Sequence, residues 1–126
     1  MTVHVVRLGS PRLPNEGVRI GTIRRPPRGV PKAEFAKQNW YDVWLPTLAP
    51  SAELMGDIHR DRISWNVFTR RYLAEMRKPE VARTLDLLAA LSHTSNFSVG
   101  CYCENEMHCH RSLLRQLLKE RGAATE

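Results

Sequence analysis

The residues best suited to chemistry lie together near the C-terminus, where three cysteines and two histidines occupy positions 101 to 110. The chain has no other cysteine, so every thiol belongs to this cluster. Thiolates and imidazoles bind metals or act as nucleophiles and bases, and a helix that starts beside them offers backbone N–H groups to an anion. The cluster consists of Cys101, Cys103, His108, Cys109 and His110, and Arg111 follows it directly.

One interpretation of the cluster is a metal site. Zinc takes four ligands from thiolate and imidazole, and an iron–sulfur cluster usually takes four cysteines, one more than the chain has. The spacing C-x-C-x5-C also differs from the paired C-x-x-C motifs of common zinc domains. Zinc or iron therefore remains an alternative, with Cys101, Cys103, Cys109 and His108 as the ligands.

A second interpretation is thiol chemistry. Cys109 is expected at a helix N-terminus beside histidines and an arginine, and each of these neighbours favours a thiolate. Cys103, at the end of the preceding strand, is expected to experience the same positive electrostatic field. In this interpretation Cys109 or Cys103 supplies the thiolate, His110 transfers protons, and Glu104 is a possible second acid or base.

A third interpretation is anion binding. Arg111, in the first turn of the helix, can grip a phosphate with two N–H groups, and Arg24 and Arg28 can complete a clamp if their loop is adjacent. The net charge of +6 favours an anionic partner, either a phosphorylated small molecule such as a nucleotide or a nucleic acid. The alternative is that these arginines pair with acidic residues in a structural network.

The elements that must position these residues follow from periodicity and capping. Stretches at 3–8, 18–23 and 97–103 predict strands, and the short connection between the first two favours an antiparallel pair. A proline or serine start, a stripe of apolar residues at helical spacing, or both together predict each helix. The expected helices cover residues 31–44, 51–58, 65–77, 79–91 and 109–121.

Length and composition predict one globular domain over residues 1–126, because 42% of the residues are hydrophobic. No apolar run approaches the roughly 18 residues of a membrane span, and the N-terminus lacks a signal-peptide pattern, so we expect a cytoplasmic location with reduced thiols. The closing strand–loop–helix unit is typical of α/β sheets. We expect a single α/β domain with a small sheet of at least three strands packed by about five helices.

Dispersed residues between positions 19 and 76 also form a pattern that resembles domain-of-unknown-function family 488, in its YeaO-like branch. The C-terminal part resembles the wider family, in which a strand ends in cysteine and the next helix opens with Cys-His-Arg. The residues that carry the first resemblance are Arg19, Arg24, Pro27-Arg28-Gly29-Val30, Lys32, Trp44, Ala49-Pro50-Ser51, Glu53-Leu54, Asp61, Trp65, Phe68, Tyr72 and Glu75, and those that carry the second are Cys101 and Cys109-His110-Arg111.

The chain departs from the family pattern at three positions. Ile23 stands in place of an acid, Pro26 in place of a tryptophan, and Cys103 in place of an acid. The resemblance implies a small α/β domain with a common site that joins the loop at 24–28 to the Cys-His-Arg turn. It implies no activity, because the family is itself largely uncharacterised.

Overall fold

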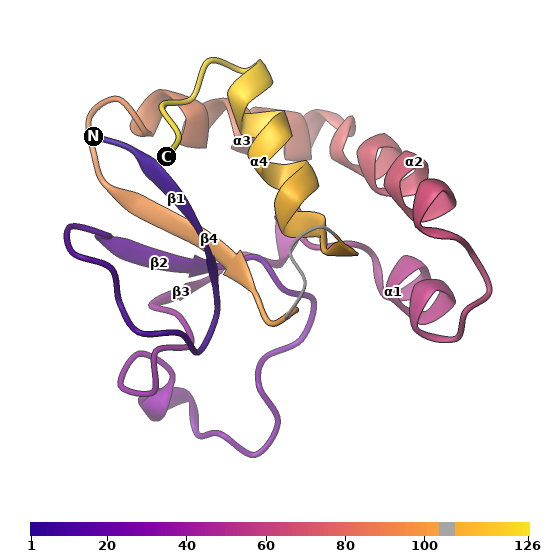
Figure 1. Ribbon diagram of the computed structural model, residues 1–126, viewed down its shortest axis with the longest axis horizontal. Coiled ribbons are helices and arrows are strands. Elements are labelled where there is room, and N and C mark those ends of the chain that lie inside the picture. The colour runs from indigo at the N-terminus through magenta and orange to yellow at the C-terminus, as the bar shows by residue number, and fades with distance from the viewer. Residues whose placement is uncertain (104–107) are drawn as a thin grey trace.

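A parallel four-stranded sheet forms the centre of the protein (Figure 1). The structure is a computed structural model that describes residues 1–103 and 108–126. The strand order is β1-β4-β2-β3, and each neighbouring pair is parallel. The α/β class and the minimum of three strands are thus confirmed. The strands are β1 (Val3–Arg7), β2 (Val18–Gly21), β3 (Val43–Trp44) and β4 (Phe97–Cys101).

The expected antiparallel pair of β1 and β2 is wrong. Both strands flank β4 instead, so that Val5 and Ile20 each pair with Val99. All five residues of β4 are buried, as suits a strand covered on both faces. The loop at residues 8–17 carries the chain from the end of β1 back to the opposite edge of the sheet, where β2 begins on the other side of β4.

The helix expected over residues 31–44 is also wrong. This segment has a short 3-10 helix at Lys32–Glu34, turns, and then the edge strand β3. Asn39 adopts a left-handed φ of 61°, which interrupts a helix. The backbone N–H of Arg19 donates to the Asp42 carboxylate at 2.8 Å, which holds this segment against the edge of the sheet.

The described residues form four α-helices rather than the expected five, with a second 3-10 helix at Pro46–Leu48. Serine caps begin two of them as predicted: Ser51 Oγ accepts from the N–H of Leu54, and Ser64 Oγ accepts from that of Val67. No helix among the described residues is long and apolar enough to cross a membrane. The helices are α1 (Ala52–His59), α2 (Trp65–Met76), α3 (Pro79–Leu91) and α4 (His110–Glu120).

The parallel pairing of the strands determines where the candidate site residues meet. The carboxyl ends of parallel strands share one edge of a sheet, and ligands of such sheets bind at that edge. β2 leads there into the arginine-rich loop, β4 ends there at Cys101, and α4 begins close to that end at His110 (Figure 1). α4 packs its buried Leu114 and Leu118 into the main core. The fold therefore brings the two segments that hold the candidate site residues to one place, although about 80 positions separate them in sequence.

Candidate functional site

A cleft of about 860 Å³ opens at this edge of the sheet. Its volume lies within the range of roughly 300–1,000 Å³ that is typical of small-molecule sites. The loop after β2, helix α1, its connection to α2, the end of β4 and the start of α4 all contribute residues to its lining. Among the lining residues are Arg24, Arg25, Arg28, Cys101, Cys103, His108, Cys109 and His110. The structure thus brings together the two segments that the family resemblance joins.

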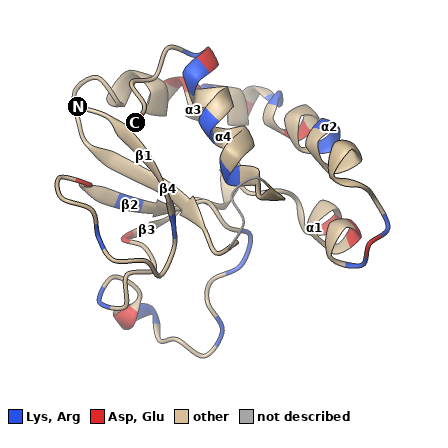
Figure 2. Ribbon diagram, in the orientation of Figure 1, with Lys and Arg blue, Asp and Glu red and all other residues tan. Residues whose placement is uncertain are grey.

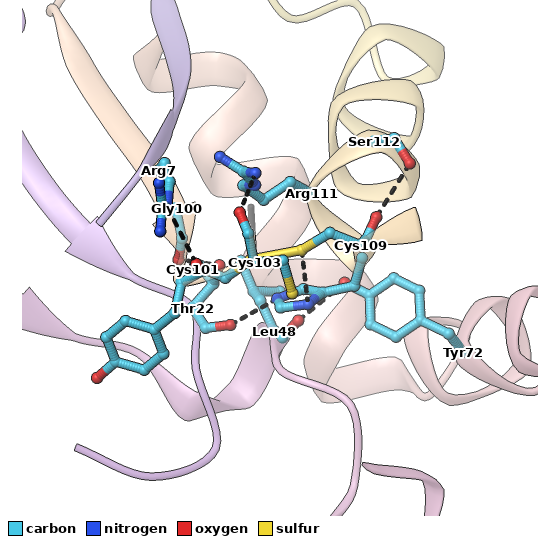
Figure 3. Close-up of a disulfide and its surroundings, with 12 residues drawn as sticks. Arg7, Thr22, Leu48, Tyr72, Gly100, Cys101, Cys103, Cys109, Arg111 and Ser112 are labelled. Carbon is cyan, nitrogen blue, oxygen red and sulfur yellow. Dashed lines mark hydrogen bonds between the residues drawn. A yellow bond between two sulfur atoms is a disulfide. The ribbon is translucent and has the colours of Figure 1, made fainter. Parts of the chain in front are cut away.

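The three cysteines converge at the floor of the cleft. Their sulfur atoms all lie within 4.8 Å of one another. Cys101 ends β4 and is buried, Cys103 follows it and is half-buried, and Cys109 is the buried N-cap residue of α4. The sulfurs of Cys101 and Cys109 are at bonding distance and are drawn as a disulfide in Figure 3. Cys103 is the free thiol of the cluster.

His110 is a buried imidazole with a defined tautomer. Its Nε2 lies 2.7 Å from the carbonyl oxygen of Thr22, which can only accept, so Nε2 carries the proton and Nδ1 has a free lone pair. Nδ1 is 3.8 Å from Cys109 Sγ. Burial lowers the pKa of His110 to about 4, and the positive charge of Arg111 acts in the same direction. The ring is therefore neutral at pH 7 and can accept a proton or bind a metal.

The environment of Cys103 differs from the expectation. Burial raises the pKa of this thiol, although the positive charges of Arg111 and Arg7 partly oppose the effect. Sequence reasoning counted the positive neighbours but could not count the burial, so it expected the thiolate to be favoured here. Of the two predicted nucleophiles, Cys109 is the one with an unprotonated imidazole nitrogen beside its sulfur.

The three predicted anion-binding arginines are placed differently. Arg28 is exposed and lines the cleft. Arg24 also lines it, but its guanidinium donates to the backbone carbonyls of residues 46, 49 and 50. Arg111 is 5% exposed, donates to the carbonyl of Cys103 at 2.6 Å, and is not among the lining residues (Figure 3). Arg28 is thus the best placed of the three to meet a ligand.

Sequence reasoning missed the opposite wall. Arg60 and Arg62, in the connection between α1 and α2, line the cleft, as does Arg25 beside Arg28. Figure 2 shows basic residues in both loops. Arg60 and Arg62 flank an acid in sequence, so the charge of their segment is locally balanced, and only the fold shows that it lines the same cleft as the first arginine loop.

The remaining predicted site residues are His108 and Glu104. His108 is exposed, lines the cleft, and has its ring centre 5.5 Å from that of Trp65. Glu104, the possible second acid or base, lies outside the described residues.

Comparisons with known proteins agree with the resemblance drawn from the residues. A family model described as "Active DUF488-N3 subclade" matches residues 3–122. The Escherichia coli (strain K12) protein named "Uncharacterized protein YeaO" is 31% identical over 80 residues, which cover 64% of this chain and 66% of that protein, just under two thirds of its length. No solved structure gives a significant match.

Proposed function

The chain belongs to the DUF488 family, and from the geometry of its cleft we propose that it binds a phosphate-bearing ligand, a nucleotide or part of a nucleic acid, as an enzyme-like domain. The observation that carries the proposal is that two arginine-containing loops line the same cleft as a free thiol and a neutral imidazole. Guanidinium groups bind phosphate oxygens through two parallel N–H bonds. The proposed ligand spans from Arg25 and Arg28 on one wall to Arg60 and Arg62 on the other.

In the reduced protein, the reactive pair of this proposal is Cys109 and His110. Nδ1 of His110 acts as a general base and takes the proton from Cys109 Sγ as the sulfur attacks an electrophilic centre of the ligand, because a buried imidazole with a lowered pKa does not hold this proton at rest. The dipole of α4 favours the negative charge that develops on the sulfur, and the imidazolium passes the proton to the leaving group as its bond to that centre breaks. Cys103 and Glu104 are secondary assignments in this scheme. Because the chemistry needs a reduced thiol, we place the protein in the cytoplasm.

Equilibrium binding tests the anion-binding part of the proposal. The probe is a fluorescent nucleoside triphosphate, titrated with the full chain at low salt. We expect Arg28→Ala to weaken binding about tenfold, the loss of one charge-assisted contact of roughly 1.5 kcal/mol. Arg83→Ala is the matched control, because Arg83 is an exposed arginine of α3 that is not among the lining residues. Equal effects of the two substitutions would contradict a site in the cleft.

A second candidate function is a non-catalytic zinc- or iron-binding module that contacts nucleic acid. The specific observation in its favour is the convergence of three sulfurs within 4.8 Å, which is the spacing of a metal-ligand set. The two candidates differ in the state of Cys109, because a thiolate that holds a structural metal is not a free nucleophile.

A further inference from the structure

We propose that the reduced thiol cluster is a tetrahedral site for one zinc ion. The inference rests on the second candidate function and deepens it, because it assigns the fourth ligand and the cation. The ligands are Sγ of Cys101, Cys103 and Cys109 and Nδ1 of His110. This proposal makes His110 the fourth ligand, in place of His108, the histidine assigned to the metal site from the sequence.

The first observation is the position of the three sulfurs. In a tetrahedral site with Zn–S bonds of about 2.3 Å, neighbouring sulfurs are about 3.8 Å apart. The three sulfurs here lie within 4.8 Å of one another, and Cys101 and Cys109, which are at bonding distance, must separate to admit the ion. The Cα atoms of Cys101 and Cys109 are 8.0 Å apart, whereas disulfides usually join Cα atoms about 4.4–6.8 Å apart. The backbone spacing therefore suits an ion between the thiols better than a direct bridge.

The second observation is the orientation of His110. A metal-bound histidine nearly always donates its other ring N–H to a carboxylate, a carbonyl or water, which fixes the tautomer. His110 already has this arrangement, because Nε2 donates to the Thr22 carbonyl while Nδ1 lies 3.8 Å from Cys109 Sγ. His108, in contrast, is exposed and has its ring beside Trp65.

The third observation is the charge around the cluster. Three thiolates, a neutral imidazole and Zn²⁺ carry a net charge of −1, which needs compensation in a buried place. Two guanidinium groups lie beside the cluster and their positive charges act on the Cys103 thiol: Arg111 donates to the carbonyl of Cys103 at 2.6 Å, and Arg7 donates to that of Tyr102 at 3.2 Å. Three cysteines and one histidine are also an established ligand set of structural zinc sites.

Zinc in this position would fasten the end of β4 to the start of α4. Residues 102–109 connect these two segments along the chain, and the ion would link them a second time through its ligands. The arginine walls would remain open to an anion. Phosphate binding and zinc binding are therefore separable properties of the same cleft.

The test uses the full chain, purified with reducing agent, and zinc itself as the probe. We expect one zinc per chain by native mass spectrometry, and thiolate-to-metal charge-transfer absorption when cobalt replaces zinc. His110→Gln keeps a donor for the Thr22 carbonyl but removes the ligand, so it should weaken zinc binding at least about tenfold in chelator competition. His108→Gln is the matched control and should change the affinity less than about threefold.

Results that differ from these expectations would contradict specific parts of the proposal. A loss with His108→Gln but not with His110→Gln would reject His110 as the ligand. Reduced protein that binds no zinc would reject the site, and rapid alkylation of Cys109 in that protein would instead support the thiol chemistry. If His110→Gln does not fold, Cys103→Ser, at a half-buried position, provides the affinity and charge-transfer test. Triphosphate binding, measured with and without zinc, reports on the arginine walls independently.

Discussion

Arg19 places all five N–H donors of its guanidinium in hydrogen bonds within the protein interior. Two go to the Glu16 carboxylate at 2.7 and 2.8 Å, and the others go to backbone carbonyls of residues 10, 11 and 39. Arg19 is fully buried, and Glu16 is 2% exposed. Ser98 of β4 donates to the same carboxylate. This arginine of the family pattern therefore holds the loop between β1 and β2 in place and has no donor left for a ligand.

The buried carboxylate of Glu16 makes stability depend on acid pH. Burial alone would raise its pKa, but hydrogen bonds from Arg19, the Leu13 N–H and Ser98, together with the charge of Arg19, lower the pKa from 4.5 to about 2. The unfolded chain therefore takes up this proton first. The stabilisation is fully present above about pH 4.5 and is lost as the pH falls through about 2.

We expect the ionised Glu16 carboxylate to contribute roughly 3 kcal/mol to the free energy of unfolding at pH 7. Urea unfolding between pH 7 and pH 2.5 measures it. Glu16→Gln should lower stability by roughly 3 kcal/mol at pH 7, since it leaves a buried guanidinium without its counter-charge, and should flatten the dependence below pH 4.5. An equally steep acid dependence in the variant would show that other carboxylates cause it.

Helix α1, which lines the cleft, depends on a contact with α2. Ser51 caps α1 by accepting from the Leu54 N–H, and its own hydroxyl and backbone N–H donate to the Glu75 carboxylate at 2.5 and 2.8 Å. Ser51 and Glu75 both belong to the family pattern. Their role in this structure is to join two helices at the cleft.

The two serine caps allow this contact to be measured. Ser64→Ala removes a simple exposed cap and should cost about 1 kcal/mol. Ser51→Ala removes a cap and also a hydrogen bond to a charged group, so we expect a loss of about 2–3 kcal/mol. Denaturant unfolding of both variants gives the comparison. If the two losses are equal, the hydroxyl contact with Glu75 contributes nothing to stability.

Local signals explain which elements the sequence could predict. The serine caps, the apolar stripes of α2 and α3 and the stop of α4 at Gly122, with its φ of 82°, all depend on neighbours within a few residues. The position of β4 between β1 and β2 depends on pairing across more than 70 residues, and no local pattern records it. The predicted helix over 31–44 failed because Asn39 takes a left-handed φ of 61° and Val43–Trp44 pair with β2 as an edge strand, and neither feature has a local signal in the sequence.

Only part of the candidate site could likewise be predicted from the sequence. The Cys-His-Arg turn and the loop at 24–28 could be joined through the family resemblance, and the structure places both at one cleft. The tautomer of His110 could not be foreseen, because it depends on a backbone carbonyl of residue 22. The wall formed by Arg60 and Arg62 escaped notice for a similar reason, since only the docking of α1 turns it toward the cleft.

At the scale of the whole molecule, part of the net charge of +6 lies at the cleft, which is lined by five arginines. Two acids on α1, Glu53 and Asp57, also line the cleft, but Asp57 is paired with Arg71 at 2.8 Å and with Arg62 at 3.8 Å. Arg25, Arg28 and Arg60 make no side-chain hydrogen bond or ion pair with another described residue, so they are available to phosphates.

This distribution predicts how binding should respond to salt. A protein that neutralises phosphates releases bound counterions, so the logarithm of its affinity falls linearly with the logarithm of salt concentration. For a short single-stranded oligonucleotide that occupies both walls, we expect Arg28→Ala to weaken binding for all sequences and to reduce the salt slope by about one. Fluorescence anisotropy across a salt series measures both quantities. Arg83→Ala should leave the slope unchanged, because α3 lies away from the cleft, and a slope equally reduced by both variants would mean that the whole basic surface, not the cleft, attracts the nucleic acid.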